Sequence, residues 1–213
     1  MTNVAPAGPP DGPPDGLRER KKARTRAAIR EHALRLFREQ GYLVTTVEQI
    51  AAAAEISPAT FFRYFPTKED VVLQDDFDLV TIGALDAQPP ELGPVAAFRA
   101  AARQSLAAMT EEDRERFRET SRLTAEVPEI RARSIDEFIR TLDAIAAALA
   151  RRLGRTEDDF TVRTLAGAII GVIMSASHAL LDASAQAGRH DDVLEIFGRI
   201  DAALAQLEAG LPV

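Results

Sequence analysis

Three histidines and many carboxylates are the residues of this 213-residue chain whose types could carry acid–base or metal chemistry. His32, His178 and His190 are far apart in the sequence, and none stands three residues after a glutamate, the spacing that di-iron helical bundles use. The chain has no glycine-rich phosphate loop and no cysteine, which excludes thiolate metal sites and disulfides. Its carboxylates stand mainly at expected helix starts and on polar faces. The sequence therefore predicts no catalytic site, no metal and no cofactor.

Phosphate binding is a second kind of chemistry, and the distribution of the basic residues favours it. From Leu17 to Pro66 the chain has ten Lys and Arg residues against five Asp and Glu residues, whereas residues 67–213 have sixteen against twenty-six. The formal net charge of −7 therefore hides a positively charged N-terminal segment. A local positive field of this kind is what binding to the DNA backbone needs.

The segment 45–65 has the pattern of two short helices joined by a tight turn, which is a helix-turn-helix. Thr45 can act as the N-cap of the first helix, and Glu48, three residues later, can complete a capping box. Ser57 can cap the second helix, Pro58 suits its first position, and the proline that follows the segment ends it. A short helix with small and hydroxyl side chains at its N-terminus fits tip first into a major groove.

Four motifs in close succession make the chain resemble the TetR family of transcriptional regulators. They are LFREQGY, TTVEQIA, SPATFFRYF and PTKEDVV, and the match spans about Arg20 to Leu73. The resemblance implies a homodimer, most often a repressor, that binds a palindromic operator in double-stranded DNA and is released by a small-molecule effector. It also implies that the helix after Pro66 connects the DNA-binding module to the effector domain.

Two positions depart from the family pattern. Glu55 stands where many members have glycine, so a positive φ there would carry strain of about 1 kcal/mol or more. Phe62 replaces a tyrosine whose hydroxyl in relatives reaches a DNA phosphate, and Tyr64 is the expected substitute.

The expected DNA contacts divide into base contacts and phosphate contacts. The base contacts are expected from Thr60 and the exposed tip formed by Ser57, Pro58 and Ala59. The phosphate contacts are expected from Arg24, Arg26, Thr45, Thr46, Arg63, Tyr64 and Lys68. For the basic residues of the first helix and for Lys68, a solvated surface is the alternative. Phe61 and Phe65 are expected in the core.

The remaining sequence predicts an all-α fold without strands. Beyond the helix-turn-helix, the apolar periodicity predicts helices over residues 17–40, 67–87, 96–109, 110–126, 128–153, 156–187 and 191–209. The expected organisation is a disordered tail over residues 1–16, a DNA-binding domain over 17–66, and a ligand-binding and dimerisation domain over 67–213.

The run from Leu165 to Leu181 is apolar on nearly every face. It has seventeen residues and includes Ser175 and His178, whereas a bilayer span needs about twenty apolar residues. A buried helix is therefore favoured over a membrane helix. Together with the apolar face of the last helix, which includes Ile196 and Ile200, it predicts a four-helix seam in a homodimer. The absence of a secretory signal fits a cytoplasmic protein.

The helices of the second domain also offer the residues of an apolar cavity. The candidates are Ser105, Phe117, Arg122, Phe138, Met174 and His178, and core packing is the alternative for each of them. As a set they predict an elongated, largely hydrophobic effector whose polar end is held by Arg122 or His178. The segment LTAEVPEIRARS and a helix ending in ALARRLG are similar to ligand domains of mycofactocin-type regulators. That similarity implies an acyl thioester as one candidate effector.

Three function hypotheses follow. The first is a DNA-binding regulator released by an effector, the second a DNA-binding protein without an effector, and the third a helical carrier or enzyme for hydrophobic ligands. Binding to a short palindrome separates the first two from the third, and release by a ligand separates the first from the second.

Overall fold

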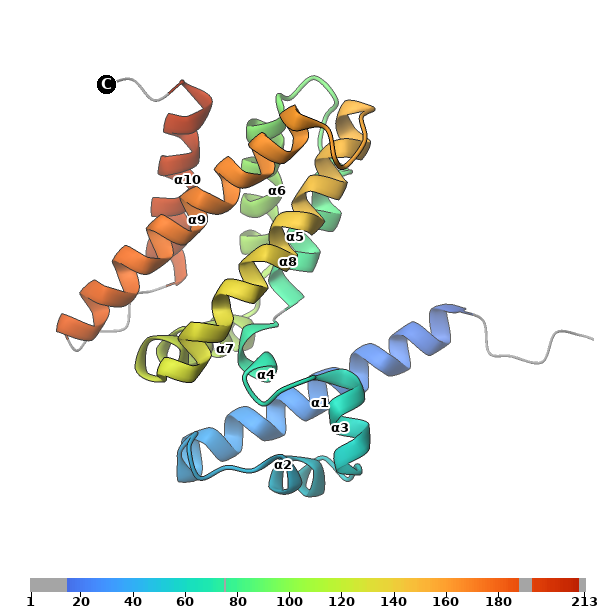
Figure 1. The fold of residues 1–213 in the computed structure, drawn as a ribbon, viewed down its shortest axis with the longest axis vertical. Helices are drawn as coiled ribbons and strands as arrows, with labels where there is room; N and C mark the ends of the chain where they lie inside the picture. The colour runs from blue at the N-terminus through green and yellow to red at the C-terminus, as the bar shows by residue number, and fades with distance from the viewer. Residues whose placement is uncertain (1–14, 75, 188–192, 211–213) are drawn as a thin grey trace, which may run out of the picture. The chain divides into compact units, whose positions relative to one another are not determined.

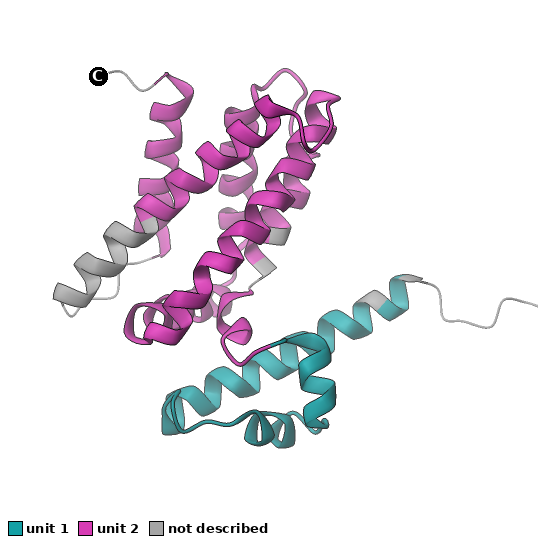
Figure 2. Cartoon of the chain, in the orientation of Figure 1, with its two compact units in different colours: residues 1–66 teal, residues 67–213 magenta. Residues whose placement is uncertain are grey.

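The computed structural model of the chain describes residues 15–74, 76–187 and 193–210. These residues form ten α-helices and no strand, which confirms the all-α class (Figure 1). The chain separates into two compact units, residues 1–66 and residues 67–213 (Figure 2). Of the expected disordered tail, residues 1–14 lie outside the described part of the chain, whereas Asp15 and Gly16 open the first helix.

In its described residues, 15–66, unit 1 contains three helices. They are α1 (Asp15–Gln40), α2 (Val47–Ala53) and α3 (Pro58–Tyr64). Its core is built from side chains of all three helices and of the segments that follow them: Ile29, Ala33, Leu34, Phe37, Tyr42, Ile50, Ala51, Phe61 and Phe65. Phe61 and Phe65 are fully buried, as the sequence predicts, and their ring centroids lie 5.9 Å apart. Helix α3 is therefore held to the unit by its aromatic side.

The N-cap of α2 is Thr46 and not Thr45, which corrects the predicted capping box. Thr46 Oγ1 accepts a hydrogen bond from the Gln49 amide at 3.3 Å, and Gln49 Oε1 accepts one from the Thr46 amide at 2.9 Å. Thr45 is buried, and its hydroxyl donates instead to the Gly41 carbonyl at 2.8 Å. The capping box therefore uses Thr46 and Gln49, one residue later than Thr45 and Glu48.

The turn between α2 and α3 contains Glu55 in the left-handed region of the backbone, with φ of 55°. This confirms that the position needs the conformation that glycine adopts without strain. Ser57 then caps α3, because its Oγ accepts a hydrogen bond from the Thr60 amide at 3.1 Å.

Unit 2, residues 67–213, opens with two short helices where the sequence predicted one long helix. α4 (Asp70–Leu73) ends at Gln74, whose ψ of 78° is not helical, and α5 (Asp76–Leu85) follows. Two aspartates follow Gln74 in the sequence, and aspartate is weak in a helix interior but favoured at a helix start. The prediction of one long connecting helix over residues 67–87 is therefore wrong.

The other helices of unit 2 agree with the predicted ones to within a few residues. They are α6 (Pro94–Ala108), α7 (Glu111–Glu126), α8 (Pro128–Leu153), α9 (Phe160–Ala187) and α10 (Val193–Glu208). Thr110 and Asp113 form a capping box at the start of α7, and Gly154 ends α8 with φ of 63°. Asp159 caps α9, because its Oδ1 accepts from the Thr161 amide at 2.9 Å.

The core of unit 2 lies between α5, α6, α8, α9 and α10. Ile145, Leu149, Val162, Ala166, Ile169 and Leu204 are among its fully or almost fully buried members. α10 packs against α9 and α6, which places Ile200 and Leu204 inside the same chain and leaves Ile196 partly buried. These apolar residues of the last helix are therefore buried within their own unit. The prediction that Ile200 lies in a seam between subunits is wrong. In the described part of the chain, no helix combines the length and the apolar content needed to cross a bilayer.

Candidate nucleic-acid interface and cavity

The N-terminal tip of α3 is open to solvent. Ser57, Pro58 and Ala59 are exposed, and Thr60 is half-buried behind them. The Oγ atoms of Ser57 and Thr60 lie 3.0 Å apart, within hydrogen-bond distance. The tip therefore presents two hydroxyls and two small apolar side chains, a set that can approach base edges closely.

The outer side of α3 carries Phe62, Arg63 and Tyr64. Arg63 is exposed, and its guanidinium carbon lies 5.4 Å from the centroid of the half-buried Tyr64 ring. Phe62 is 50% exposed, packed edge-on against the buried Phe61. In the sequence, Phe62 was considered only because it lacks the hydroxyl of a tyrosine. In the structure its exposed ring, beside Arg63, adds an apolar surface to α3. The aromatic residue type at position 62 is the sequence signal that could have identified this surface.

Two of the residues expected to contact phosphates have internal roles in unit 1. Arg26 is half-buried, donates to the Tyr64 carbonyl at 3.4 Å and lies 4.6 Å from the centroid of the Phe65 ring. Thr45 is 1% exposed and bonds to Gly41. Arg26 thus braces α1 against the end of α3, while the neighbouring Arg24 and Thr46 are exposed.

Lys68 stands at the start of unit 2 and is half-buried. Burial lowers its pKa below the ordinary value, although Glu69 and Glu129 partly oppose that effect. Two carboxylates of its own unit therefore lie within electrostatic reach of its ammonium group.

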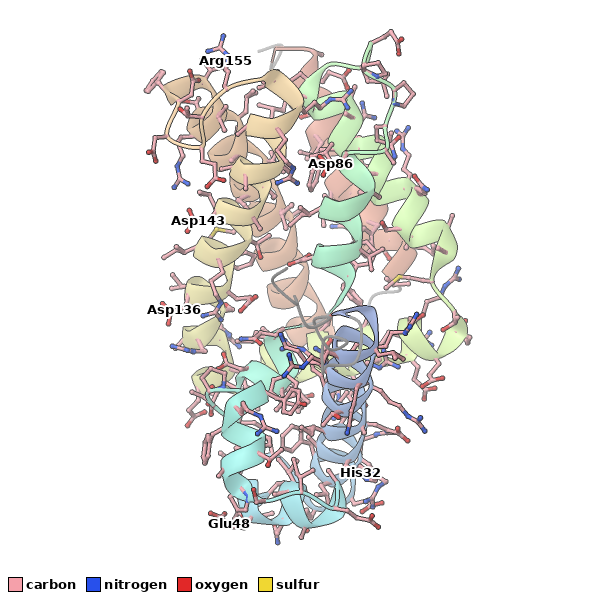
Figure 3. All side chains as sticks on the ribbon, turned by 90° about the vertical axis from the view of Figure 1, so that its right-hand side faces the viewer. His32, Glu48, Asp86, Asp136, Asp143 and Arg155 are labelled. Carbon is pink, nitrogen blue, oxygen red and sulfur yellow. The ribbon has the colours of Figure 1, made fainter. Side chains whose placement is uncertain are left out.

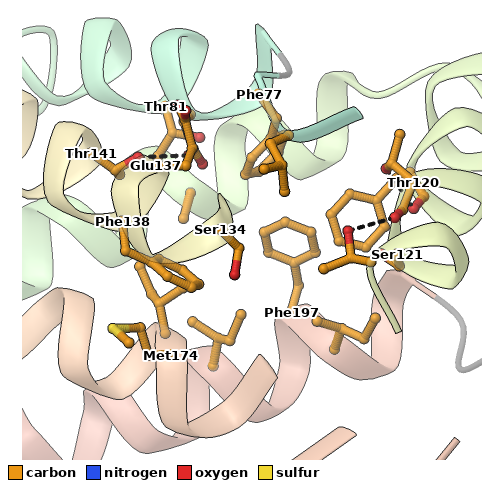
Figure 4. Close-up of a pocket in the computed structure, with 18 of the residues that line it drawn as sticks. Phe77, Thr81, Thr120, Ser121, Ser134, Glu137, Phe138, Thr141, Met174 and Phe197 are labelled. Carbon is orange, nitrogen blue, oxygen red and sulfur yellow. Dashed lines mark hydrogen bonds between the residues drawn. The ribbon is translucent and has the colours of Figure 1, made fainter. Parts of the chain in front are cut away.

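Unit 2 contains a cavity of about 1090 Å³ whose wall is mainly apolar (Figure 4). At its centre Phe197 of α10 lies between Phe77 of α5 and Phe117 of α7, with centroid distances of 4.7 and 5.6 Å. Phe98, Phe138, Ile135, Ile173, Met174 and Ile196 extend this apolar surface. The volume lies at the upper end of the range of small-molecule sites.

The structure brings together four of the six residues expected at the cavity. Phe117, Arg122, Phe138 and Met174 line it. Ser105 does not, because it continues the buried row of α6 that contains Ala97 and Ala101, whereas Phe98, Ala102 and Leu106 face the cavity. His178 lies on α9 at a position whose side chain is outside the described residues.

A polar wall on α5 and α8 was missed by the sequence reasoning. It consists of Asp78 and Thr81 on α5 and Ser134, Glu137 and Thr141 on α8, all lining the cavity. Thr141 donates to Asp78 Oδ2 at 3.2 Å, which joins the two helices. The spacings of three and four residues place each group on one face of its helix. Nothing in the sequence says that the two faces meet.

The opposite side of the cavity carries arginines that are already paired. Arg99 donates to Asp201 Oδ1 at 3.0 Å, and Arg103 donates to Asp201 Oδ2 at 2.7 Å. Arg118 and Arg122 pair with Glu111 and Glu126, each at 2.8 Å. Burial raises the pKa of Asp201, but the bonds from the two arginines outweigh it and hold that pKa below its usual range.

Asp70, in the short helix α4, is a fully buried carboxylate. Its Oδ2 accepts from the Thr67 amide at 3.0 Å, and its Oδ1 lies 3.5 Å from Arg133 Nε and 3.6 Å from Arg140 Nη2 of α8. Arg140 also pairs with Glu137, which lines the cavity. Asp70 therefore ties the first helix of unit 2 to the polar wall of the cavity.

Three carboxylates outside these two regions are exposed. Glu48, Asp136 and Asp143 point outward from their helices (Figure 3). Within the residues that the structure describes, no group of three or more His, Cys, Asp and Glu side chains could hold a metal ion.

Two family models match the chain. Residues 29–74 match the model of bacterial regulatory proteins of the tetR family, and residues 92–212 match the model of the MftR C-terminal domain. The first match covers the helix-turn-helix and the start of unit 2, and the second covers most of the cavity.

Individual proteins show the same likeness. The chain is 35% identical over 156 residues to the HTH-type transcriptional regulator TcmR of Streptomyces glaucescens, covering 68% of this chain and 67% of that protein. It is 31% identical over 169 residues to a protein of Mycobacterium tuberculosis described as a mycofactocin biosynthesis transcriptional regulator, MftR, covering 78% and 84%. The structure of Thermus thermophilus FadR, a transcriptional repressor in complex with lauroyl-CoA, is similar with a TM-score of 0.51 and 26% identity, covering 88% of this chain and 95% of that one.

Proposed function

The chain belongs to the TetR family of transcriptional regulators, and on that premise we propose that it is a repressor released from its operator by a small, largely hydrophobic effector. The observation that carries the proposal is the presence in one chain of an exposed recognition tip and a large apolar cavity. The family assignment makes the chain a regulator and not an enzyme. Operator symmetry, the homodimer and the effector class are proposals.

The proposed DNA contacts follow from exposure on unit 1. Ser57, Pro58, Ala59 and Thr60 meet base edges, while Arg24, Thr46 and Arg63 bind phosphates. Tyr64 is half-buried, and its hydroxyl is proposed to bind a phosphate; Lys68, in unit 2, is also half-buried and is a further proposed phosphate ligand. Arg26 and Thr45 act indirectly, because their bonds fix α3 and the start of α2.

The proposed assembly is a homodimer in which α9 and α10 use their remaining exposed surfaces. On α9 these are at Gly171, Met174 and Ser175, and on α10 at Leu194, Gly198 and Ala202. Such a dimer reads a palindrome whose half-sites are about 34 Å apart, one turn of the double helix. An effector then acts by favouring a state whose recognition helices have another separation.

The apolar wall of the cavity supports a hydrophobic effector. FadR holds lauroyl-CoA and is 26% identical, which supports an elongated apolar ligand and keeps an acyl thioester as a candidate. Phe117, Phe138 and Met174 would contact the apolar body. Arg122 pairs with Glu126 through Nη1, and its other N–H groups would hold a polar end.

Asp70 provides a route from the cavity to the segment that follows unit 1. A ligand that moves Glu137 or Thr141 displaces α8, and Arg133 and Arg140 transmit that displacement to the carboxylate of Asp70. Since Asp70 follows the end of unit 1 by four residues, α4 is the element that the effector repositions.

The proposal is tested by selecting genomic DNA fragments that the protein retains and then following their release. We expect a short palindromic site, and release by apolar compounds but not by sugars. If the protein retained random fragments with equal affinity, the proposal of a specific operator would be contradicted. If only sugars released the DNA, the proposal of a hydrophobic effector would be contradicted. If no compound released it, a DNA-binding protein without an effector would be favoured.

A further inference from the structure

The exposed side of α3 is largely apolar, and Phe62 lies in its middle. Pro58 and Ala59 precede Phe62 by four and three residues, which places all three on one side of the helix. Arg63 stands four residues after Ala59 and borders the same side. These four residues are exposed, whereas Phe61 is fully buried in the core of unit 1. A partner that covers α3 therefore meets Phe62 together with the tip.

The ring of Phe62 is supported from below although it is 50% exposed. Its centroid lies 5.5 Å from the centroid of the Phe61 ring, and the two ring planes make an angle of 89°. Aromatic pairs favour this edge-to-face arrangement. Because Phe61 itself is fully buried, α3 presents an oriented apolar ring to its partner.

A phenyl ring cannot make the phosphate contact that the family resemblance implies for a tyrosine at this position. It has no hydrogen-bond donor, and phosphate oxygens are bound by donors and cations. In the major groove, the base edges present donors, acceptors and one apolar group, the C5-methyl of thymine. Phenylalanine is among the side chains that contact this methyl group. The thymine methyl is therefore the group of the major groove that matches Phe62.

The charge of unit 1 identifies DNA as the partner that covers this ring. From Leu17 to Pro66 there are ten basic residues against five acidic ones. Arg63 is exposed directly beside Phe62, and its guanidinium carbon lies 5.4 Å from the centroid of the Tyr64 ring. An apolar ring flanked by a cation suits a groove whose floor carries methyl groups and whose edges carry phosphates.

We propose, on the premise that unit 1 binds operator DNA, that Phe62 is a specificity-determining residue whose ring packs on the C5-methyl group of one thymine in each half-site. The contact distinguishes thymine from cytosine, which presents no methyl group in the groove. It gives Phe62 a base contact in place of the phosphate contact expected of a tyrosine. It also extends the base-reading surface from the tip, Ser57 to Thr60, along α3.

The test replaces thymine with uracil, which pairs with adenine in the same way and lacks only the methyl group. Synthetic duplexes of the site that the full chain selects carry uracil at one thymine of a half-site at a time, and their affinities are measured by fluorescence anisotropy. The parent should bind one of these duplexes about fourfold more weakly than the thymine duplex, the effect of one buried methyl group. With the same change in both half-sites, the loss should be about fifteenfold.

Substitutions assign this loss to a residue. Phe62→Ala and Phe62→Gln should each bind that uracil duplex and the thymine duplex equally, because the partner of the methyl group is gone. Arg63→Ala should weaken binding to both duplexes and keep their ratio, as expected for a phosphate contact. Phe160→Ala, the same change at an exposed phenylalanine of unit 2, should behave like the parent. Salt-dependent binding to a random duplex shows that unit 1 of each variant is folded.

Equal affinity of the parent for the thymine duplex and every uracil duplex would overturn the inference. A uracil effect that persists in both Phe62 variants would also overturn it, and Phe62 would then serve only to pack against Phe61. The parent's preference for the selected site over a random duplex separates the two proposals. Without that preference both proposals fail, whereas a strong preference with no uracil effect leaves the operator standing and overturns the assignment of Phe62 alone.

Discussion

Replacing Glu55 with glycine is expected to stabilise unit 1. Glu55 is exposed and has φ of 55°, so the substitution removes backbone strain without removing a buried contact. A non-glycine residue in the left-handed region carries about 1–2 kcal/mol of strain. The greater freedom of glycine in the unfolded chain offsets about 0.4–1 kcal/mol of this. The net expected gain in the free energy of unfolding is about 0.5–1 kcal/mol.

The two tyrosines of the chain make this gain measurable in the intact protein. Tyr42 and Tyr64 both belong to unit 1, and the chain has no tryptophan, so tyrosine fluorescence during urea unfolding follows unit 1 alone. With a slope of about 1 kcal/mol per M for so small a unit, the midpoint should rise by about 0.5–1 M. Glu48→Gly is the matched control, because Glu48 is also exposed but lies in α2. It should lower the midpoint, since glycine weakens a helix by about 0.5–1 kcal/mol. A fall of similar size for Glu55→Gly would refute the strain at this turn.

Three further substitutions test other parts of the account. Thr60→Trp should abolish the preference for the operator over random DNA in a binding assay and keep the salt-dependent affinity for both, whereas an intact preference would contradict the orientation of α3. Ile200→Glu should unfold unit 2 in a circular dichroism melt, because the charge is buried in the chain's own core, while Ile139→Glu, the same change on the exposed side of α8, should melt like the parent. Asp201→Asn should lower stability at neutral pH, since the folded state holds the pKa of Asp201 below its unfolded value. That loss should be constant above about pH 5 and shrink below about pH 4 as the parent protonates, and a loss that grows in acid would contradict the ion pairs.

Local chemistry was sufficient to predict most helices of this chain. Ser57 and Pro58 start α3, and Gly154 ends α8 at a positive φ, because each feature depends on residues adjacent in the sequence. The cap of α2 could not be settled in this way. Thr45 and Thr46 each have an acceptor three residues later, and the bond from Thr45 to the Gly41 carbonyl decides between them.

The errors that remain come from contacts between distant segments. Periodicity identifies the apolar face of α10 but does not say whether that face packs on its own chain or on a partner, and the structure places Ile200 in its own core. From the sequence alone, Arg26 was expected to bind a phosphate. In the structure it contacts the Tyr64 carbonyl and the Phe65 ring instead. The polar wall of the cavity could not be predicted from the sequence, because it forms only where α5 and α8 pack together and Thr141 bonds to Asp78.

The linkage between the cavity and DNA tests the central proposal most directly. In one sample series, a compound that binds the protein by calorimetry is added to the protein bound to a fluorescent operator, and release is followed by anisotropy. A repressor with an effector site requires that the compound and the operator weaken each other's binding by the same factor, at least about fivefold. The account predicts this reciprocal loss, and it predicts that filling the cavity by Ser134→Trp removes both the binding of the compound and the release. An operator that stays bound at full affinity while the cavity is saturated would contradict it.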